Sequence, residues 1–431
     1  MITVAFVTFG CKVNYSETSF IKNQLLSEGF KEVKLDEGPD IIFINTCTVT
    51  NNADIECLRT IKSIADKYPE SDIIVTGCYA QIRYNDIKKI KGVKAIFGNQ
   101  DKFQIVDYIK SLGNRKEQCI EVSDIRNCCQ FNSAMSYNDR TRSFLKIQDG
   151  CDFWCSYCVI PMARGKSRSD TIEHIVDNVD FLNKKGIKEI VITGVNVGDY
   201  GIINNKRECS LYDLLVTLET LNNDIRYRIS SIELNLLTDQ IVEFINKSKH
   251  FVKHFHIPLQ SGSDKILKLM RRRYTTDKYK DKILKIKKLM PMCCIGADVI
   301  VGFPGEDADS FKETYELLKS LPVSYLHVFP YSERDNTLAI HLDNKVDKKE
   351  KDKRVKILRD LSDVKKKCFY ESNIGNVVEV LFERQVDDDG YIYGYSDNYI
   401  RVRHEYNTNI IDNIVPIKIF RVDNLIACGE L

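Results

Sequence analysis

Three cysteines within eight residues constrain this chain more than any other feature. They are Cys151, Cys155 and Cys158, with the spacing Cys-x3-Cys-x2-Cys. Thiolates are the usual ligands of iron–sulfur clusters, and a 4Fe-4S cluster normally takes four. Three thiolates would hold three irons and leave the fourth open to a small molecule. A structural zinc site would need a fourth Cys or His nearby, and the next in the chain are His174 and Cys209. The spacing therefore favours a 4Fe-4S cluster over zinc or plain core cysteines.

Cysteine content and the amino-terminal residues indicate a reducing compartment. The chain has 15 cysteines in 431 residues, an odd number, and its apolar stretch at 1–9 lacks the basic segment and cleavage site of a signal peptide. Such cysteines are expected as metal ligands or buried thiols. No apolar run approaches the ~20 residues needed to cross a bilayer. We therefore expect a cytoplasmic protein with no membrane partner, in two to four domains of ~150 residues each.

Continuous apolar runs separated by helix-like stretches characterise the first hundred residues. The runs lie at 4–10, 40–46, 72–77 and 93–98. Such runs are typical of parallel strands covered by helices on both faces. A cysteine follows each of the first three at once, namely Cys11, Cys47 and Cys78. Taken singly, each is more often a small buried residue than a ligand. Because ligands bind at the carboxyl ends of parallel strands, the three together predict a second three-thiolate cluster.

The remainder of the chain predicts two further folding units. Strands are expected at 144–148, 189–193, 227–231, 254–257, 295–301 and 325–329. Six strands with crossover helices predict a partial (β/α)6 barrel with active residues at the carboxyl ends of its strands. After residue 375, short alternating strands and the Asp389-Gly390 turn predict a small antiparallel β-barrel. The fold class is thus α/β, with domains at 1–112, 143–370 and 371–431 and a connecting segment at 113–142.

Charge is unevenly distributed along a chain whose net charge is only +2. Asp264–Lys288 holds eleven Lys/Arg against three Asp, and Lys345–Lys367 holds eleven against five acidic residues. Such clusters are typical of a nucleic-acid contact, although a solvated helix face explains them equally well. Ser372–Leu431 has only five Lys/Arg against ten Asp/Glu, an unusual balance for a domain that holds RNA.

In this combination, the motifs resemble the methylthiotransferase family of radical S-adenosylmethionine (SAM) enzymes, which join an amino-terminal cluster domain, a partial barrel and a TRAM domain. The resemblance covers nearly the whole chain. Besides the Cys151–Pro161 loop, it is carried by Gly10–Asn14, Asn45–Cys47, Thr76–Cys78, Ala163–Ser169, Thr193–Asn196, Ser230–Glu233, Pro258–Ser263 and Gly302–Glu306. One departure is Asp170, which stands where the family usually has an arginine.

Within the family, Lys12-Val13-Asn14 and His327–Tyr331 are similar to the branch that acts on N6-threonylcarbamoyladenosine in tRNA, beside the anticodon. The isopentenyladenosine branch usually reads Gln-Met-Asn after the first cysteine. A third branch modifies an aspartate of a small-subunit ribosomal protein. The resemblance therefore implies methylthio transfer to carbon 2 of the modified adenine, with tRNA as the substrate partner.

The resemblance also implies cofactors and roles. Two 4Fe-4S clusters are expected, one on Cys151, Cys155 and Cys158 that binds and cleaves SAM, and one on Cys11, Cys47 and Cys78 that carries the sulfur to be transferred. A low-potential electron donor would supply the electron for SAM cleavage. SAM contacts are expected from Tyr157, Gly194, Asn196, Gln260, Ser261 and Gly262, and RNA contacts from Arg271, Arg272, Arg273, Arg401 and Arg403.

Several alternatives stay open. Tyr157 is as readily a core aromatic, and His256 and His327 either meet the base or are satisfied core histidines. The other nine cysteines, Cys57 among them, are interpreted as structural. Two rival functions are methylthiolation of a ribosomal protein and a non-catalytic role as an RNA-binding iron–sulfur protein.

Overall fold

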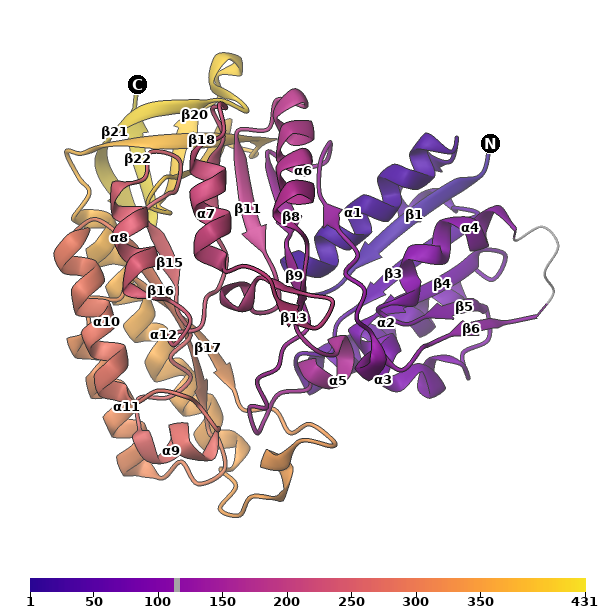
Figure 1. Ribbon diagram of the computed structural model, residues 1–431, viewed down its shortest axis with the longest axis horizontal. Helices are drawn as coiled ribbons and strands as arrows, with labels where there is room; N and C mark the ends of the chain where they lie inside the picture. Colours follow the sequence, from indigo (N-terminus) through magenta and orange to yellow (C-terminus); the bar gives the residue numbers. More distant parts are fainter. Residues whose placement is uncertain (112–116) are drawn as a thin grey trace.

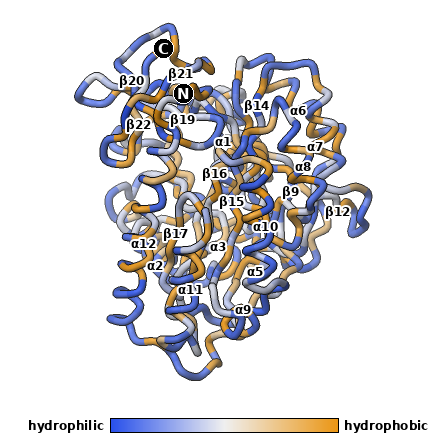
Figure 2. Tube along the Cα trace, turned by 90° about the vertical axis from the view of Figure 1, so that its left-hand side faces the viewer, coloured by the Kyte–Doolittle hydropathy of each residue, from blue (hydrophilic) through white to orange (hydrophobic). Residues whose placement is uncertain are grey.

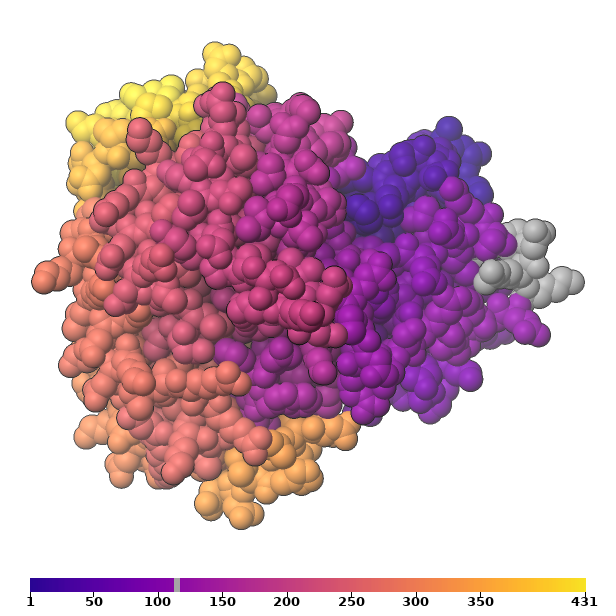
Figure 3. Space-filling view, viewed as in Figure 1, coloured from indigo at the N-terminus to yellow at the C-terminus, as the bar shows by residue number. Residues whose placement is uncertain are grey.

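The computed structural model describes residues 1–111 and 117–431. An amino-terminal α/β domain packs beside a central barrel, and a small β-barrel lies at one end of the latter (Figure 1). In the space-filling view the first two meet along a continuous boundary (Figure 3). The boundary expected at 112/113 lies outside the described residues. The fold class predicted from the sequence is confirmed.

A six-stranded parallel sheet organises the amino-terminal domain, in the order β2-β1-β3-β4-β5-β6. Its strands are β1 (Thr3–Thr8), β2 (Lys31–Glu32), β3 (Ile41–Thr46), β4 (Asp72–Gly77), β5 (Val93–Phe97) and β6 (Cys119–Glu121). Its helices are α1 (Lys12–Ser27), α2 (Asn51–Lys67), α3 (Cys78–Ile87) and α4 (Ile105–Lys110). Alternate residues of β3 enter separate cores on the two faces: Ile42 lies in one, Phe43 in the other. This two-sided burial explains the continuous apolar runs.

The expected connecting segment has strands of its own. Its β6 joins the amino-terminal sheet beside β5, whereas β7 (Ala134–Met135) pairs antiparallel with β8 (Arg142–Lys146) of the barrel. Neither strand was predicted from the sequence, because β6 has three residues and β7 only two, too few to show an apolar pattern.

Six parallel strands form an open barrel. They are β8, β11 (Glu189–Thr193), β14 (Arg226–Ile229), β15 (His254–His256), β16 (Cys294–Val301) and β17 (Tyr325–Pro330). Continuous pairing joins the first three and the last three, and isolated bridges such as Ser231 to His256 connect β14 to β15. The outer layer is made by α6 (Ile172–Lys184), α7 (Leu211–Glu219), α8 (Asp239–Lys247), α10 (Thr276–Leu289), α11 (Ala308–Ser320) and α12 (Lys348–Glu371).

Several inward-facing side chains of this barrel are polar or charged. Along β16, Ile295, Ala297 and Val299 belong to the apolar core shared with the helices. The alternate residue Asp298 therefore faces the space enclosed by the strands, which we call the lumen. By the same alternation Glu189 and Arg228 also face the lumen. These polar groups are suited to a charged or hydrogen-bonding ligand.

A closed five-stranded barrel ends the chain. It consists of β18 (Val377–Val386), β19 (Tyr391–Ser396), β20 (Arg401–Glu405), β21 (Ile414–Asp423) and β22 (Ile426–Glu430). Arg226, the first residue of β14, donates to the carbonyl oxygens of Glu379 and Tyr395 at 2.8 and 2.7 Å. Arg228 donates to that of Ser396 at 3.0 Å. The small barrel is therefore fixed at the amino-terminal ends of the central strands.

Hydrophilic residues interrupt the hydrophobic ones along the helices (Figure 2). In the part of the chain that the structure describes, no helix is long and apolar enough to cross a membrane.

Candidate active site

The three strand-end cysteines of the amino-terminal domain lie at one edge of its sheet. Cys11 caps α1 just after β1, Cys47 follows β3, and Cys78 begins α3. A Cβ on Gly10 would lie only 2.7 Å from the Sγ of Cys47, so the first two loops touch. The three thiols also influence one another electrostatically. The structure thus brings together the three residues that the sequence predicted as a group.

Their geometry is not that of a site for one ion. Among the residues that the structure describes, neither cysteine triad has its three sulfurs within 4.8 Å of one another. Ligands of a single ion stand that close, whereas thiolates bound to three different irons of a cluster stand farther apart. Burial raises the pKa of Cys47 to about 12 and also raises that of Cys11. These thiols therefore stay protonated until a metal displaces the proton, and the donor set fits an iron–sulfur cluster.

The second triad lies in the loop after β8 and β9 (Gln148–Asp149). The Cys158 amide donates to the Cys155 carbonyl oxygen at 3.1 Å, and the Cys151 amide donates to that of Gly165 at 3.0 Å. These bonds fold the loop so that its three thiols interact electrostatically. Burial raises the pKa of both Cys151 and Cys158 to about 12. This triad also fits a cluster whose irons replace the thiol protons.

One arginine connects the two triads. Arg164 belongs to α5 (Ile160–Arg164), directly after the second cysteine loop, and its side chain is 1% exposed. Its Nε donates to the Sγ of Cys78 at 3.2 Å, and its Nη1 donates at 3.0 Å to Asp149, just before the second cysteine loop. It also donates to Asn14 and Glu17 of α1. Sequence analysis placed Arg164 in a motif but assigned it no role.

Glu17 forms ion pairs with three cations at this junction. It accepts from Arg164, from Lys102 at 2.6 Å and from Lys146 of β8 at 2.9 Å. Burial opposes ionisation of Glu17, but the three cations hold its pKa well below the usual value. A buried charge network therefore fixes the amino-terminal domain against the barrel between the two triads.

Two of the predicted SAM contacts lie beside the second cysteine loop. The Asn196 amide donates to Gln148 Oε1 at 2.8 Å, and Asn196 Nδ2 lies 3.9 Å from the Sγ of Cys151. The buried Oδ1 of Asn196 has no partner in the described structure, which is costly unless a ligand supplies a donor. Gly194 packs so closely on Gln148 that a Cβ would meet it at 2.9 Å. A cofactor with hydrogen-bond donors fits this position.

Other predicted SAM contacts have local partners. Ser261 and Gly262 are buried against α11, where the Gly262 amide donates to Thr314 Oγ1 at 2.9 Å. Tyr157 packs edge-on against Phe303, with ring centroids 6.3 Å apart. The backbone of Gln260 lies in the left-handed region, with a φ of +66°. Ser261 and Gly262 thus contact a helix outside the lumen, and the Tyr157 ring contacts Phe303.

The predicted RNA contacts differ in accessibility. Arg271 and Arg273 are exposed, and Arg401 is exposed over the ring of Tyr393. Arg403 is partly covered and pairs with Asp423 at 3.1 Å.

Arg272 has a different environment from its two neighbours. Its side chain is 3% exposed, pairs with Glu233, and donates from Nη1 to the Sγ of Cys155 at 3.3 Å. A phosphate cannot reach this guanidinium, because burial and these partners already occupy it. We therefore correct its expected RNA contact to a contact with the second cysteine loop.

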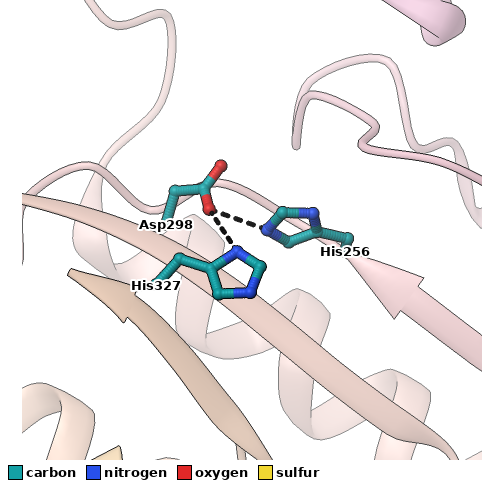
Figure 4. A group of neighbouring side chains, drawn as sticks. All are labelled: His256, Asp298 and His327. Atoms are coloured by element: carbon teal, nitrogen blue, oxygen red, sulfur yellow. Dashed lines mark hydrogen bonds and ion pairs between the residues drawn. The ribbon is translucent and has the colours of Figure 1, made fainter. Parts of the chain in front are cut away.

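Asp298 lies in the lumen between two histidines (Figure 4). Its Oδ1 accepts from His256 Nε2 at 2.8 Å and from His327 Nδ1 at 3.2 Å. Burial opposes ionisation of Asp298, but these two bonds lower its pKa well below the usual value. The side chain of His327 is 51% exposed. Asp298 thus orients a histidine toward the lumen, and an aspartate within the apolar run at 295–301 was the signal that sequence analysis overlooked.

Comparison with known proteins gives two family matches. Residues 145–318 match the radical SAM superfamily, and residues 3–98 match the uncharacterized protein family UPF0004. The solved structure of the radical SAM methyltransferase TsrM from Kitasatospora setae, with tryptophan and a SAM analogue bound, is similar with a TM-score of 0.53 at 13% identity. It covers 76% of this chain and 73% of that one. The barrel and its cysteine loop therefore define a radical SAM enzyme, a class that uses SAM and a 4Fe-4S cluster.

Curated relatives extend over nearly the whole chain. The threonylcarbamoyladenosine tRNA methylthiotransferase MtaB of Bacillus subtilis is 38% identical, covering 98% of this chain and 94% of that protein. The MtaB of Aquifex aeolicus is 36% identical, covering 93% of this chain and 96% of that protein. A tRNA-2-methylthio-N(6)-dimethylallyladenosine synthase of Clostridium botulinum is 31% identical, covering 98% of this chain and 95% of that protein. The chain belongs to the radical SAM methylthiotransferase family, which confirms the resemblance and the enzyme class.

Proposed function

We propose that this enzyme transfers a methylthio group to carbon 2 of N6-threonylcarbamoyladenosine, next to the anticodon of tRNA, with two 4Fe-4S clusters and two SAM per turnover. The observation that carries the proposal is the junction of the two cysteine triads at Arg164, in a chain 38% identical to a threonylcarbamoyladenosine tRNA methylthiotransferase. Cys11, Cys47 and Cys78 hold one cluster, and Cys151, Cys155 and Cys158 hold the other.

The bound clusters and SAM supply the radical and sulfur chemistry that side chains lack. The chain positions them. Arg164 and Arg272 each donate a hydrogen bond to one ligand sulfur, Cys78 and Cys155 respectively, and such bonds tune cluster potentials. Asn196 offers its unpartnered Oδ1 to a donor of SAM. A low-potential electron donor is the further partner that this chemistry needs.

The lumen receives the target base. An enzyme that modifies a base atom takes that base out of its stack, and His327 extends into the lumen with its orientation fixed by Asp298. Its free Nε2 can then hydrogen-bond an adenine edge. His256 and His327 would therefore contact the target base, whereas the cysteine loops would hold the clusters.

Exposed arginines at two places on the molecule support RNA as the substrate. Arg271 and Arg273 are free of ion pairs in the described chain. A cavity of about 350 Å³ at the seam of α12 and the small barrel is lined by Tyr395, Tyr399 and Arg401, among others. Exposed cations such as Arg401 contact phosphates, whereas the rings of Tyr395 and Tyr399 are already stacked on each other and beneath Arg142 and Arg228.

Mass analysis of tRNA nucleosides tests the proposal. A strain lacking the gene should lose the methylthio form of threonylcarbamoyladenosine and retain that of isopentenyladenosine, and the wild-type gene should restore the loss. A variant with Cys151, Cys155 and Cys158 changed to alanine serves as the inactive control. Persistence of the methylthio nucleoside in the deletion strain would refute the tRNA substrate, and a change in a ribosomal protein's mass there would favour the rival substrate.

A further inference from the structure

The side chains of His256, Asp298 and His327 gather three possible metal-ligand atoms around one point. The atoms are His256 Nε2, Asp298 Oδ1 and His327 Nδ1, and all lie within 4.8 Å of one another. Among residues 1–111 and 117–431, no second group of three His, Cys, Asp or Glu side chains is so close. Both rings converge on the same carboxylate oxygen, at 2.8 and 3.2 Å, while the other oxygen points away from them (Figure 4).

Three neighbouring strands of the barrel hold this group in place. His256 ends β15, Asp298 belongs to β16 and His327 belongs to β17. Because β16 lies between the other two strands, Asp298 is directly opposite His327, and His256 is opposite Gly296, two residues before Asp298. The positions are on paired strands and not on loops, so the sheet itself sets the spacing of the three donor atoms.

Asp298 lacks the permanent cations that balance Glu189, which pairs with Arg226 and Arg228. In the described chain only histidines pair with Asp298. Imidazole is mostly neutral near pH 7, yet the pKa of the Asp298 carboxyl is well below its usual value, so this group is ionised. Carboxylates that are largely buried are normally paired with a cation or bound to a metal. A divalent ion would supply the missing charge.

We propose that His256, Asp298 and His327 bind one divalent metal ion of the kind that prefers imidazole and carboxylate ligands, with Zn²⁺ as its representative. In a tetrahedral zinc site with bonds of about 2.0–2.1 Å, ligand atoms stand about 3.3 Å apart. The distances from Asp298 Oδ1 to the two rings are close to this value.

The exposure of His327 indicates the type of site. Its side chain is 51% exposed, so the ion keeps an open position toward the lumen. Three protein ligands and one open position are typical of a zinc ion that binds water or substrate, whereas structural zinc has four protein ligands. Metal binding at Nδ1 leaves the Nε2 of His327 free to hydrogen-bond a base in the lumen.

Zinc content tests the proposal on the reconstituted enzyme, with neither SAM nor RNA present, so the result does not depend on the proposed substrate. The enzyme is dialysed anaerobically against Zn²⁺ buffered with nitrilotriacetate, and zinc and iron per chain are measured by mass spectrometry. Zinc displaces residual Fe²⁺ from such a site, because it binds the same ligands more tightly. The wild type should retain about one zinc per chain more than Asp298→Asn or His327→Gln, at equal iron content.

His174→Gln is the matched control. The Nδ1 of His174 pairs with Asp170 at 2.9 Å, and its side chain is 53% exposed, but no third ligand joins this pair in the described chain. This variant should retain the zinc content of the wild type. Equal zinc in the wild type and Asp298→Asn would overturn the proposal and leave the three side chains as a hydrogen-bonded group only.

X-ray absorption at the zinc edge tests the wild type without any substitution, so it does not depend on how the variants fold. Zinc at the proposed site should have nitrogen and oxygen neighbours at about 2.0–2.1 Å, whereas zinc held by stray thiols has sulfur at about 2.3 Å. A first shell of sulfur alone would overturn the proposal whatever the zinc content of the variants.

Discussion

Arg164 and Cys78 are 86 residues apart in the sequence, yet the guanidinium Nε donates to the cysteine sulfur at 3.2 Å. Arg164 follows one cysteine loop, and Cys78 belongs to the other triad. The same guanidinium donates to Asp149 and Glu17, so it is fixed in both position and charge. A single buried side chain thus links two sites that the sequence places in different domains.

Removing this contact should change the cluster that we propose at Cys78. A hydrogen bond to a ligand sulfur stabilises the more electron-rich, reduced cluster, so Arg164→Lys, which cannot reproduce the guanidinium fork, should lower its midpoint potential. An EPR-monitored redox titration measures this in a variant that lacks Cys151, Cys155 and Cys158. Arg126→Lys, at an exposed position, should leave the potential unchanged. Equal potentials for both variants would contradict the assigned contact.

Iron counting tests the two triads. The reconstituted wild type should hold about eight irons in two 4Fe-4S clusters, and Cys11→Ala or Cys158→Ala should lower this to about four by loss of one cluster's ligands. Cys57→Ala is the demanding control, because the Sγ of Cys57 lies 3.5 Å from the Cys47 amide nitrogen. We expect it to keep all of the iron. Loss of iron in that variant would make Cys57 a ligand.

The three consecutive arginines should separate into two roles. Arg273→Ala removes an exposed cation that lies 4.1 Å from the ring of Phe153. It should weaken tRNA binding uniformly and reduce the salt slope by about 1. Arg272→Ala should leave RNA affinity unchanged and diminish SAM cleavage, since it removes the contact with Cys155. Filter binding across salt concentrations and deoxyadenosine release measure the two effects, and a similar loss of RNA affinity in both variants would refute the distinction.

Glu189 should be important for stability. It is fully buried and pairs with Arg226 and Arg228, so Glu189→Gln leaves buried cations unpaired and should lower the free energy of unfolding by about 3–5 kcal/mol. Glu243→Gln, in an exposed pair with Lys285, should cost less than about 1 kcal/mol. Urea denaturation of both variants compares them, and equal costs would contradict the buried network.

The same carboxylate predicts a direction of pH dependence. Burial raises the pKa of Glu189, but the arginines outweigh it and hold the pKa below its usual value. Its contribution to stability is therefore complete above about pH 4.3, the unfolded value, and is lost as the pH falls toward the folded pKa. In Glu189→Gln the loss of stability below that pH should be shallower.

Sequence patterns predicted the parts of this site that are local or periodic. The spacing of Cys151, Cys155 and Cys158 is local, and the position of Cys47 follows from the rule that strand ends meet at one edge of a parallel sheet. Cross-domain contacts have no such signal. Arg272 is part of a basic run that typically faces solvent, and only the fold shows that its side chain turns inward to Glu233.

Arg226 and Arg228 hold the small barrel against the amino-terminal ends of the central strands. A substrate of the lumen is therefore expected to approach from the carboxyl-terminal ends of the strands, where the second cysteine loop follows β8 and β9. An RNA loop can satisfy this geometry only by projecting one nucleotide inward while its body stays outside. Product escape thus retraces the path of substrate entry, which makes withdrawal of the enlarged, methylthiolated base a candidate for the slowest step of the cycle.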